Sequence, residues 1–217
     1  MAMHFPTPLD THPDLDSKCL HVKTIRKCAN NYLYQQGETA RTLYRIRTGV
    51  VSLESVNERG ERCIIHLLGR GAVLGHEIFL QQPRNFDARV CADATIEAIS
   101  LSSGIESILG VSLMRWANAA ALNLLQEAAG FKVELHRAQA GDKVLLLLEQ
   151  LQKLHPEQTD ACWLPSRCEM ADLLDMNHAT ASRVVAKLFK EGALHRAASK
   201  DFVRVDWGRI RRLRASG

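Results

Sequence analysis

The stretch Glu169–Leu194, EMADLLDMNHATASRVVAKLFKEGAL, holds two apolar runs of helical period separated by the short break DMN. Asn177 is a favourable N-cap for the second run, and Gly192 lies just past its end, where helices often finish on a glycine. Small polar side chains and an arginine gather near the start of this second run. The stretch therefore predicts a helix, a tight turn and a second helix with a polar face near its beginning.

The residues on either side extend this pair of helices into a larger motif. Upstream, Ser166 and Glu169 have the spacing of a capping box at the start of the first helix. Downstream, HRAASKDFVRVDW predicts a β-hairpin with strands at 194–196 and 202–205 and a turn between them. Two helices joined by a tight turn and followed by a hairpin form a winged helix-turn-helix, whose second helix enters the major groove of DNA.

The second helix carries the chemistry that reading DNA requires. Arg183 can form two hydrogen bonds to one guanine, and Thr180 and Ser182 can donate to bases or phosphates. The first helix begins with Ser166 and Arg167, where free backbone N–H groups favour a phosphate. An ordinary solvated surface helix is the alternative interpretation. The full set of predicted DNA contacts is Ser166, Arg167, Asn177, His178, Ala179, Thr180, Ser182, Arg183, Lys187 and Lys200.

The N-terminal half of the chain has the period of β-strands. Segments that alternate apolar and polar residues end at glycines, such as TLYRIRTG at Gly49 and then VVSLESV. Asn57 and Gly60 in NERGER supply the conformations of a hairpin turn. We therefore predict a β-roll sensor domain over 20–106, preceded by a flexible tail over 1–19.

A long helix is predicted at 107–136, and it leads into a C-terminal DNA-binding domain at 137–217. Thirty residues span roughly 45 Å of helix. Its apolar and small-residue stripe is typical of a helix that packs on a partner helix, with burial inside its own domain as the alternative. Gly130 marks a kink, a close approach or a break. The predicted dimer-interface residues are Leu113, Trp116, Ala120 and Leu124.

Composition sets limits on the class of protein. The chain has 217 residues, 46% of them apolar, and a net charge of +4, which is compatible with nucleic acid without requiring it. No apolar run approaches the roughly 20 residues that cross a bilayer, and the N-terminus lacks the features of a signal peptide. We expect a cytoplasmic protein without membrane contact. None of the six cysteines forms a C-x-x-C pair, so we expect free thiols.

From about Lys23 to Trp207 the sequence resembles the Crp/Fnr family of bacterial transcription regulators. The segments that carry this resemblance are LYQQGETARTLYRIRTGVVSL, LLGRGAVLG and LPSRCEMADLLDMNHATASRVVAKLFKEGAL, which occur in the family's order. The resemblance implies an α+β chain with a cyclic-nucleotide-binding-like β-roll, a long dimerisation helix and a C-terminal winged helix-turn-helix. It also implies a homodimer on a pseudo-palindromic operator, an effector site in or beside the roll, and RNA polymerase as a partner.

Three departures from the family bear on the signal and on the DNA sequence. Where the cyclic-AMP branch has a glutamate after the glycine, Gly75 is followed by His76, with Glu77 one place later; we therefore do not expect cyclic AMP to bind. The N-terminal cysteines are too few and wrongly spaced for the standard four-iron cluster of the Fnr branch. Ala179 replaces the family's glutamate and cannot accept a hydrogen bond from cytosine, so we expect a half-site that differs from the usual TGA core at that base.

The nature of the effector stays open at the level of sequence. Histidine and cysteine in the roll keep haem or a metal as options, with His66 and His76 as candidate ligands; hydrogen-bonded core histidines are the alternative. A small organic or anionic ligand is a further option, with a pocket predicted from His66, Leu68, Gly75, His76, Glu77, Arg84 and Asn85. Thiol oxidation is another, with the redox candidates Cys19, Cys28, Cys63 and Cys91.

Two other classes of protein remain as alternatives. One is a cupin-like metal-binding protein or enzyme, because a small roll with histidines is also that scaffold. The chain lacks a His-x-His pair and any recognisable catalytic motif, so we expect no enzyme. The other is a DNA-binding protein whose degenerate sensor domain responds to no effector. Such a protein would bind its operator equally well with any small molecule present.

Overall fold

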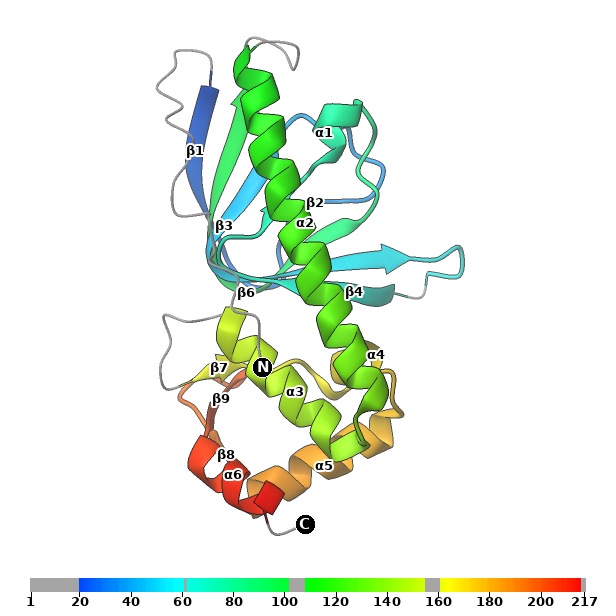
Figure 1. Ribbon diagram of the computed structural model, residues 1–217, viewed down its shortest axis with the longest axis vertical. Coiled ribbons are helices and arrows are strands. Elements are labelled where there is room, and N and C mark those ends of the chain that lie inside the picture. Colours follow the sequence, from blue (N-terminus) through cyan, green and yellow to red (C-terminus); the bar gives the residue numbers. More distant parts are fainter. Residues whose placement is uncertain (1–19, 61, 102–107, 155–160, 216–217) are drawn as a thin grey trace.

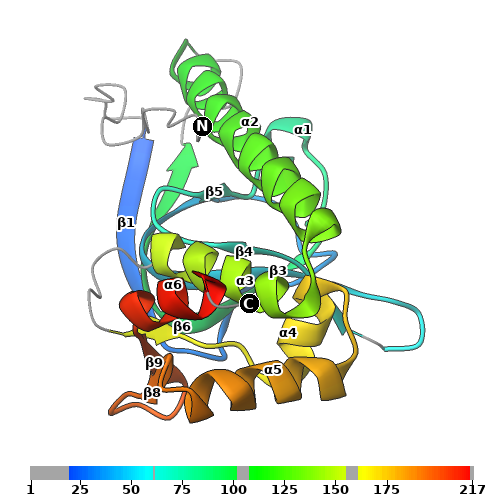
Figure 2. The ribbon, with the colours of Figure 1, turned by 60° about the horizontal axis from the view of Figure 1, so that its bottom comes forward.

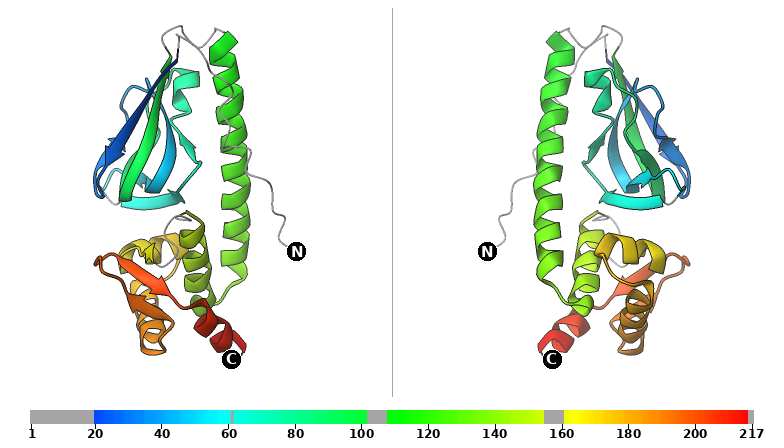
Figure 3. Two further views of the ribbon diagram at one scale, coloured as in Figure 1. Left: turned by 90° about the vertical axis from the view of Figure 1, so that its left-hand side faces the viewer. Right: turned by 90° about the vertical axis from the view of Figure 1, so that its right-hand side faces the viewer.

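The computed structural model describes residues 20–60, 62–101, 108–154 and 161–215 (Figure 1). The predicted tail 1–19, and with it the redox candidate Cys19, lies outside these residues. A β-roll lies at one end of the molecule and a small helical unit at the other, and a long helix runs beside both (Figure 3). Below, "the roll" means residues 20–101, and "the winged-helix unit" means residues 140–215.

The roll is a six-stranded antiparallel sheet in the order β1-β6-β3-β4, with β2 on β6 and β5 on β3. The two long strands curl because their register shifts at several bulges. The prediction that one strand ends at Gly49 was wrong, since β3 runs through it with a φ of 94°. The elements are β1 Leu20–Lys27, β2 Tyr32–Tyr34, β3 Leu43–Val56, β4 Arg62–Leu68, β5 Val73–Leu74, α1 Glu77–Leu80 and β6 Asp87–Leu101.

Apolar side chains form a core inside the roll. Ile46, Val51, Leu68 and Ile96 are buried there and pack against one another with other apolar residues. A second apolar cluster joins the roll to the long helix and includes Leu43. The roll therefore has an apolar core of its own.

The long helix, α2, runs from Ile108 to Arg137 without a break at Gly130. One face packs on the roll, which corrects part of the predicted dimer interface: Leu113 and Ala120 are only 1% and 5% exposed because they pack on the roll of the same chain. Trp116 and Leu124 also pack partly against the roll.

The winged-helix unit contains the predicted pair of helices and hairpin. Ser166 and Glu169 form the predicted capping box, and the side chain of Asn177 accepts a hydrogen bond from the N–H of Ala179. The three strands pair in the order β7-β9-β8. The elements are α3 Ala140–Leu154, β7 Cys162–Trp163, α4 Arg167–Leu174, α5 His178–Lys190, β8 Leu194–Arg196, β9 Phe202–Val205 and α6 Trp207–Ala215.

The roll and the winged-helix unit share an apolar core. Ile64 and Leu67 of β4 and Cys91 of β6 belong to the same cluster of buried residues as Leu148 and Leu151 of α3. At Gly69 the two parts approach so closely that an added Cβ would lie 2.6 Å from the carbonyl oxygen of Leu154. The two parts are therefore packed against each other in this conformation.

Candidate DNA-binding surface and sensor roll

Helix α5 lies at the end of the molecule that is farthest from the roll (Figures 1 and 2). Its buried residues Ala181, Val185 and Leu188 anchor one face in the unit's core. The opposite face carries the predicted DNA-reading residues. Of these, His178, Ala179, Arg183 and Lys187 are exposed, whereas Thr180 and Ser182 are half-buried.

The arginine of this surface is held on its own helix. Arg183 Nε donates to the carbonyl oxygen of Ala179 at 3.3 Å, and Nη2 donates to Thr180 Oγ1 at 3.2 Å. Both bonds are local and exposed, so they can be exchanged for bonds to a base at small cost. Lys187 lies one turn farther on and forms an exposed i,i+4 ion pair with Glu191.

The turn between α4 and α5 is fixed by local geometry and by one lysine. Asp175 closes α4 in the left-handed conformation with a φ of 46°. Lys143 of α3 donates to the carbonyl oxygen of Leu174 at 3.0 Å, which satisfies an otherwise free end of α4. This bond ties the end of α4, where the turn to α5 begins, to α3.

The remaining predicted DNA contacts flank α5. Ser166 is exposed at the start of α4, and Arg167 is half-buried, with burial lowering the pKa of its guanidinium. Lys200 is exposed in the turn between β8 and β9, which forms the wing. The wing and α5 thus belong to the same unit, as a winged helix-turn-helix requires.

In the roll, four of the predicted pocket residues meet around Arg84. Arg84 Nη1 donates to Glu77 Oε2 at 3.2 Å, and Nη2 donates to the carbonyl oxygen of Thr42 at 2.5 Å. The guanidinium also lies 4.3 Å from the ring centroid of Tyr34. The backbone N–H of Asn85 donates to Glu77 Oε1, so the carboxylate of Glu77 binds both Arg84 and Asn85.

Gly75 makes this cluster possible. It has a φ of 91°, and an added Cβ would lie 2.4 Å from Arg84 Nη1. Only a residue without a side chain leaves room for the guanidinium there. Arg84 is buried. Tyr34 is buried as well, and its own burial is the main cause that raises the pKa of its hydroxyl. Arg84, a residue of the predicted effector pocket, is thus already bound to groups of its own chain.

The two candidate metal-ligating histidines differ in their surroundings. His76 Nε2 is 3.0 Å from the carbonyl oxygen of Ala117, which ties the turn after Gly75 to α2. His66 is half-buried on β4, and burial lowers its pKa, so its imidazole is neutral near pH 7. Within the described part of the chain, no three His, Cys, Asp or Glu side chains gather as a metal site would require.

The predicted redox cysteines of the roll do not share one environment. Cys28 and Cys63 are exposed, whereas Cys91 is buried. Burial raises the pKa of the Cys91 thiol to about 11, and its Sγ lies 3.3 Å from Ser52 Oγ. Because the reactive species is the thiolate, Cys91 is the least suited of the three to oxidation.

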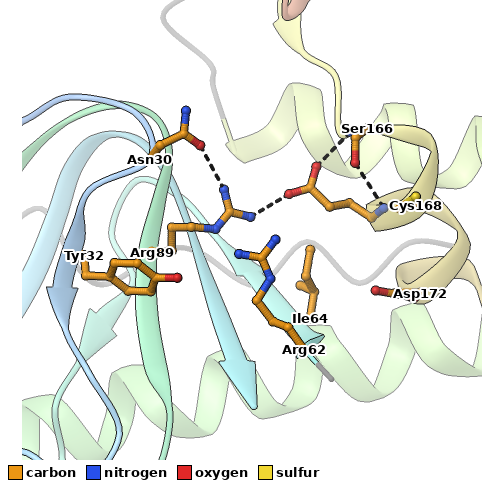
Figure 4. A pocket seen from close by; sticks show the side chains of 9 residues that line it. Asn30, Tyr32, Arg62, Ile64, Arg89, Ser166, Cys168 and Asp172 are labelled. Carbon is orange, nitrogen blue, oxygen red and sulfur yellow. Dashed lines mark hydrogen bonds and ion pairs between the residues drawn. The ribbon is translucent and has the colours of Figure 1, made fainter. Parts of the chain in front are cut away.

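Sequence reasoning missed a cleft between the roll and the winged-helix unit (Figure 4). Its volume is about 540 Å³. Arg89 of β6 bridges it, with bonds to Glu54 on one side and Glu169 on the other. The sequence gives no signal for this cluster, because Glu54, Arg89 and Glu169 lie far apart along the chain. The lining residues are Asn30, Tyr32, Arg62, Ile64, Arg89, Ser166, Cys168, Glu169 and Asp172.

Comparisons with known proteins agree with this architecture. Residues 25–106 match the family model described as a cyclic nucleotide-binding domain. The transcriptional regulator SdrP of Thermus thermophilus is 23% identical over 175 residues, which cover 80% of each chain. None of the described helices is long and apolar enough to span a membrane.

Solved structures support the same conclusion at the level of fold. TTHB099, a transcriptional regulator of the CRP family from Thermus thermophilus, matches with a TM-score of 0.71 at 18% identity, covering 87% of this chain and 95% of that one. FixK2 from Bradyrhizobium japonicum matches with a TM-score of 0.67 at 22% identity, covering 89% and 97%. The matched proteins that are named here are regulators and not enzymes. The predicted resemblance is confirmed: the chain carries a cyclic nucleotide-binding domain and has the α+β fold of the Crp/Fnr family of transcription regulators.

Proposed function

We propose that this chain is a sequence-specific DNA-binding transcription regulator of the Crp/Fnr type. The observation that carries this proposal is the exposed polar face of α5, which lies beside a wing in one rigid unit. In this role Arg183 reads a base, while Lys187 and Lys200 bind phosphates. A regulator of this kind acts on double-stranded DNA in the cytoplasm and contacts RNA polymerase.

The proposed assembly is a homodimer formed through the outer face of α2. Leu122, Leu125 and Val133 are 56%, 65% and 51% exposed on this face. Gly130 lies on the same helix, and an added Cβ there would meet no atom within 4 Å, so a second helix can approach closely. These residues replace Leu113 and Ala120 as the proposed contacts. Two copies related by a two-fold axis would present two α5 helices to a pseudo-palindromic site.

The proposed signal acts through the roll and is not cyclic AMP. Arg84, the group best suited to a phosphate, is buried and paired with Glu77. A cyclic nucleotide would have to break this ion pair and leave Glu77 without its partner. Haem or a metal at His66 stays a candidate, since a neutral imidazole is the form that ligates metals. Oxidation of the exposed thiols Cys28 and Cys63 and a small organic or anionic ligand are the other candidates.

A second candidate function is regulation without an effector. The internal partners of Arg84 favour it, because they give this residue a structural role in the roll. The absorbance spectrum of protein purified without oxygen distinguishes a haem-bound protein from one that responds through its thiols and from one without an effector, because only the first is coloured. Operator affinity measured with oxidant, with cyclic AMP and with neither then separates a regulated protein from an unregulated one.

The first test of the proposed function is selection of duplexes from a random library by the full chain. We expect enrichment of a site with two related half-sites about one helical turn apart. Enrichment of no sequence would refute the proposal.

Leu125→Asp tests the dimer: we expect a monomer in sedimentation and a large loss of affinity for the two-half-site duplex. Glu127→Asp, an exposed neighbour on the same helix, should leave both unchanged.

A further inference from the structure

Glu54, Arg89 and Glu169 form a continuous series of charged side chains across the boundary between the roll and the winged-helix unit. Figure 4 shows Arg89 at this boundary, opposite Ser166. Arg89 Nε donates to Glu54 Oε1 at 2.7 Å, and Arg89 Nη2 donates to Glu169 Oε1 at 2.6 Å. The side chains of Glu54 and Arg89 are 0% and 7% exposed, so water screens them little. Ser52 also donates to Glu54 Oε1 at 2.6 Å, which fixes Glu54, the inner residue of the three, in the roll.

Glu169, the outer residue of the three, is bonded to the backbone at the start of α4. The other oxygen of Glu169 accepts the N–H of Ser166 at 2.8 Å, so one carboxylate both caps the helix and binds Arg89. Burial acts to raise the pKa of Glu169, but bonds from Ser166 and Arg89 outweigh it and hold the pKa below its usual value. The contact therefore joins Arg89 to the first turn of α4.

The apolar contacts at this boundary cannot set an orientation by themselves. Burial of Ile64, Leu67 and Cys91 favours proximity, but the hydrophobic effect has no direction. Short charge-assisted hydrogen bonds have a defined geometry. The bond between Arg89 and Glu169 thus adds a directional contact to the apolar packing at this boundary.

This orientation places the start of α4 in a poor position for DNA. Ser166, a proposed phosphate contact, lines the cleft opposite Arg62 and Ile64 of the roll. A cleft of about 540 Å³ has the volume of a small-molecule site and does not admit a duplex. In this state α5 is open to DNA, while the roll forms the other side of the cleft beside the beginning of α4.

We propose that Glu54, Arg89 and Glu169 form an interdomain latch that restrains DNA binding until it opens. The latch rests on the proposed function, since its role is to regulate the same DNA-binding surface. When Arg89 releases Glu169, the winged-helix unit can turn away from the roll, and the roll no longer stands beside Ser166 where a phosphate would bind. The buried pair with Glu54 keeps Arg89 in the roll while the unit moves.

The variant that tests the latch is Glu169→Gln. Glutamine can also close a capping box, so α4 keeps its N-terminal cap while the ion pair with Arg89 is lost. We expect the affinity for the selected duplex to rise about fivefold, as a charge-assisted bond becomes a neutral one. The control is Asp172→Asn, which removes one negative charge from the same helix and the same cleft outside the latch. We expect it to leave the affinity unchanged.

Opening of the boundary can be measured separately by alkylation of two buried thiols. Cys91 lies at the boundary, whereas Cys162 lies on β7 inside the winged-helix unit, and burial raises the pKa of each to about 11. We expect Glu169→Gln to raise the alkylation rate of Cys91 about fivefold relative to that of Cys162, measured by peptide mass spectrometry. Equal acceleration of both thiols would indicate unfolding and would overturn the latch.

Two other outcomes would also overturn it: an unchanged Cys91 rate in Glu169→Gln, or an accelerated Cys91 with unchanged or weaker DNA affinity. Arg183→Ala distinguishes failure of the latch from failure of the proposed function. If the natural chain binds the duplex no better than Arg183→Ala, DNA binding through α5 is refuted. The ratio of the two thiol rates then still decides whether Glu169 holds the roll and the winged-helix unit together.

Discussion

The winged-helix unit and the roll each hold an arginine at their predicted site, but the two arginines have opposite surroundings. Arg183 is exposed and bonds to Thr180 and Ala179 of its own helix. Arg84 is buried and bonds to Glu77 and to the carbonyl oxygen of Thr42, beside the ring of Tyr34. An exposed group with local bonds can turn toward a ligand, whereas a buried one leaves a charged partner behind. The same residue type is thus available to a ligand in one region and supports the fold in the other.

The largest expected effect comes from breaking the roll at Gly49. In Gly49→Ala the new Cβ would lie 2.5 Å from the carbonyl oxygen of Asp93 and 2.6 Å from the Cα of Ala94. Backbone cannot move aside easily, so we expect the free energy of unfolding to fall by about 3 kcal/mol or more. Urea denaturation measures this change. Gly37→Ala is the control, because Gly37 has a similar φ but open space around it; it should cost about 1–2 kcal/mol.

A smaller loss of stability should follow Glu77→Ala if Arg84 is part of the structure of the roll. The substitution leaves the buried guanidinium without its carboxylate, and we expect a cost of about 2 kcal/mol in the free energy of unfolding. Glu58→Ala, in the exposed turn before β4, should be neutral. If Glu77→Ala were neutral and the variant bound cyclic AMP, Arg84 would be a ligand-binding group and the comparison with Arg183 would fail.

Next in size is the effect of Arg183→Ala on DNA binding. Loss of a bidentate contact to guanine should cost about 1–3 kcal/mol and relax specificity at one base pair. Lys187→Ala should instead weaken binding to every sequence and reduce the salt slope by about one. Fluorescence anisotropy over a series of salt concentrations and single-base variants measures both. Identical specificity profiles for the two variants would contradict the assigned roles.

A finer test concerns Ala179, which is exposed at the start of α5. Ala179→Glu supplies the carboxylate that can accept a hydrogen bond from cytosine, so we expect preference to shift toward the TGA core by about 1–2 kcal/mol. Competition between the TGA half-site and the selected half-site measures the shift. An unchanged TGA core in sites selected by the natural chain would contradict the prediction. Ala179→Ser serves as a small polar control without the charge.

The smallest expected effect is a pH dependence from His66. Burial lowers its pKa in the folded state, so the unfolded chain binds more protons just below pH 6.5. Stability contributed by neutral His66 is present above about pH 6.5 and is lost as the pH falls through the folded pKa. We expect His66→Gln to flatten this slope in unfolding measured from pH 7 to pH 5. His21→Gln, at an exposed position on β1, should retain it.

The sequence alone was sufficient for features that depend on neighbouring residues. The capping box of Ser166 and Glu169, the cap at Asn177 and the hairpin at 194–205 all occur as predicted. Caps and turns are decided by bonds within a few residues, so their signal is local. The long helix was also predictable, because thirty residues of helical period are a strong pattern.

Tertiary structure alone decided which partner each surface and each charge has. The stripe of α2 that contains Leu113 and Ala120 had the pattern of an interface, and it is buried on the roll of the same chain. A periodic apolar stripe predicts burial but does not name the partner. Glu54, Arg89 and Glu169 come together although 35 and 80 residues separate the bonded pairs. Such contacts depend on how sheet and helices pack, and no local pattern in the sequence encodes them.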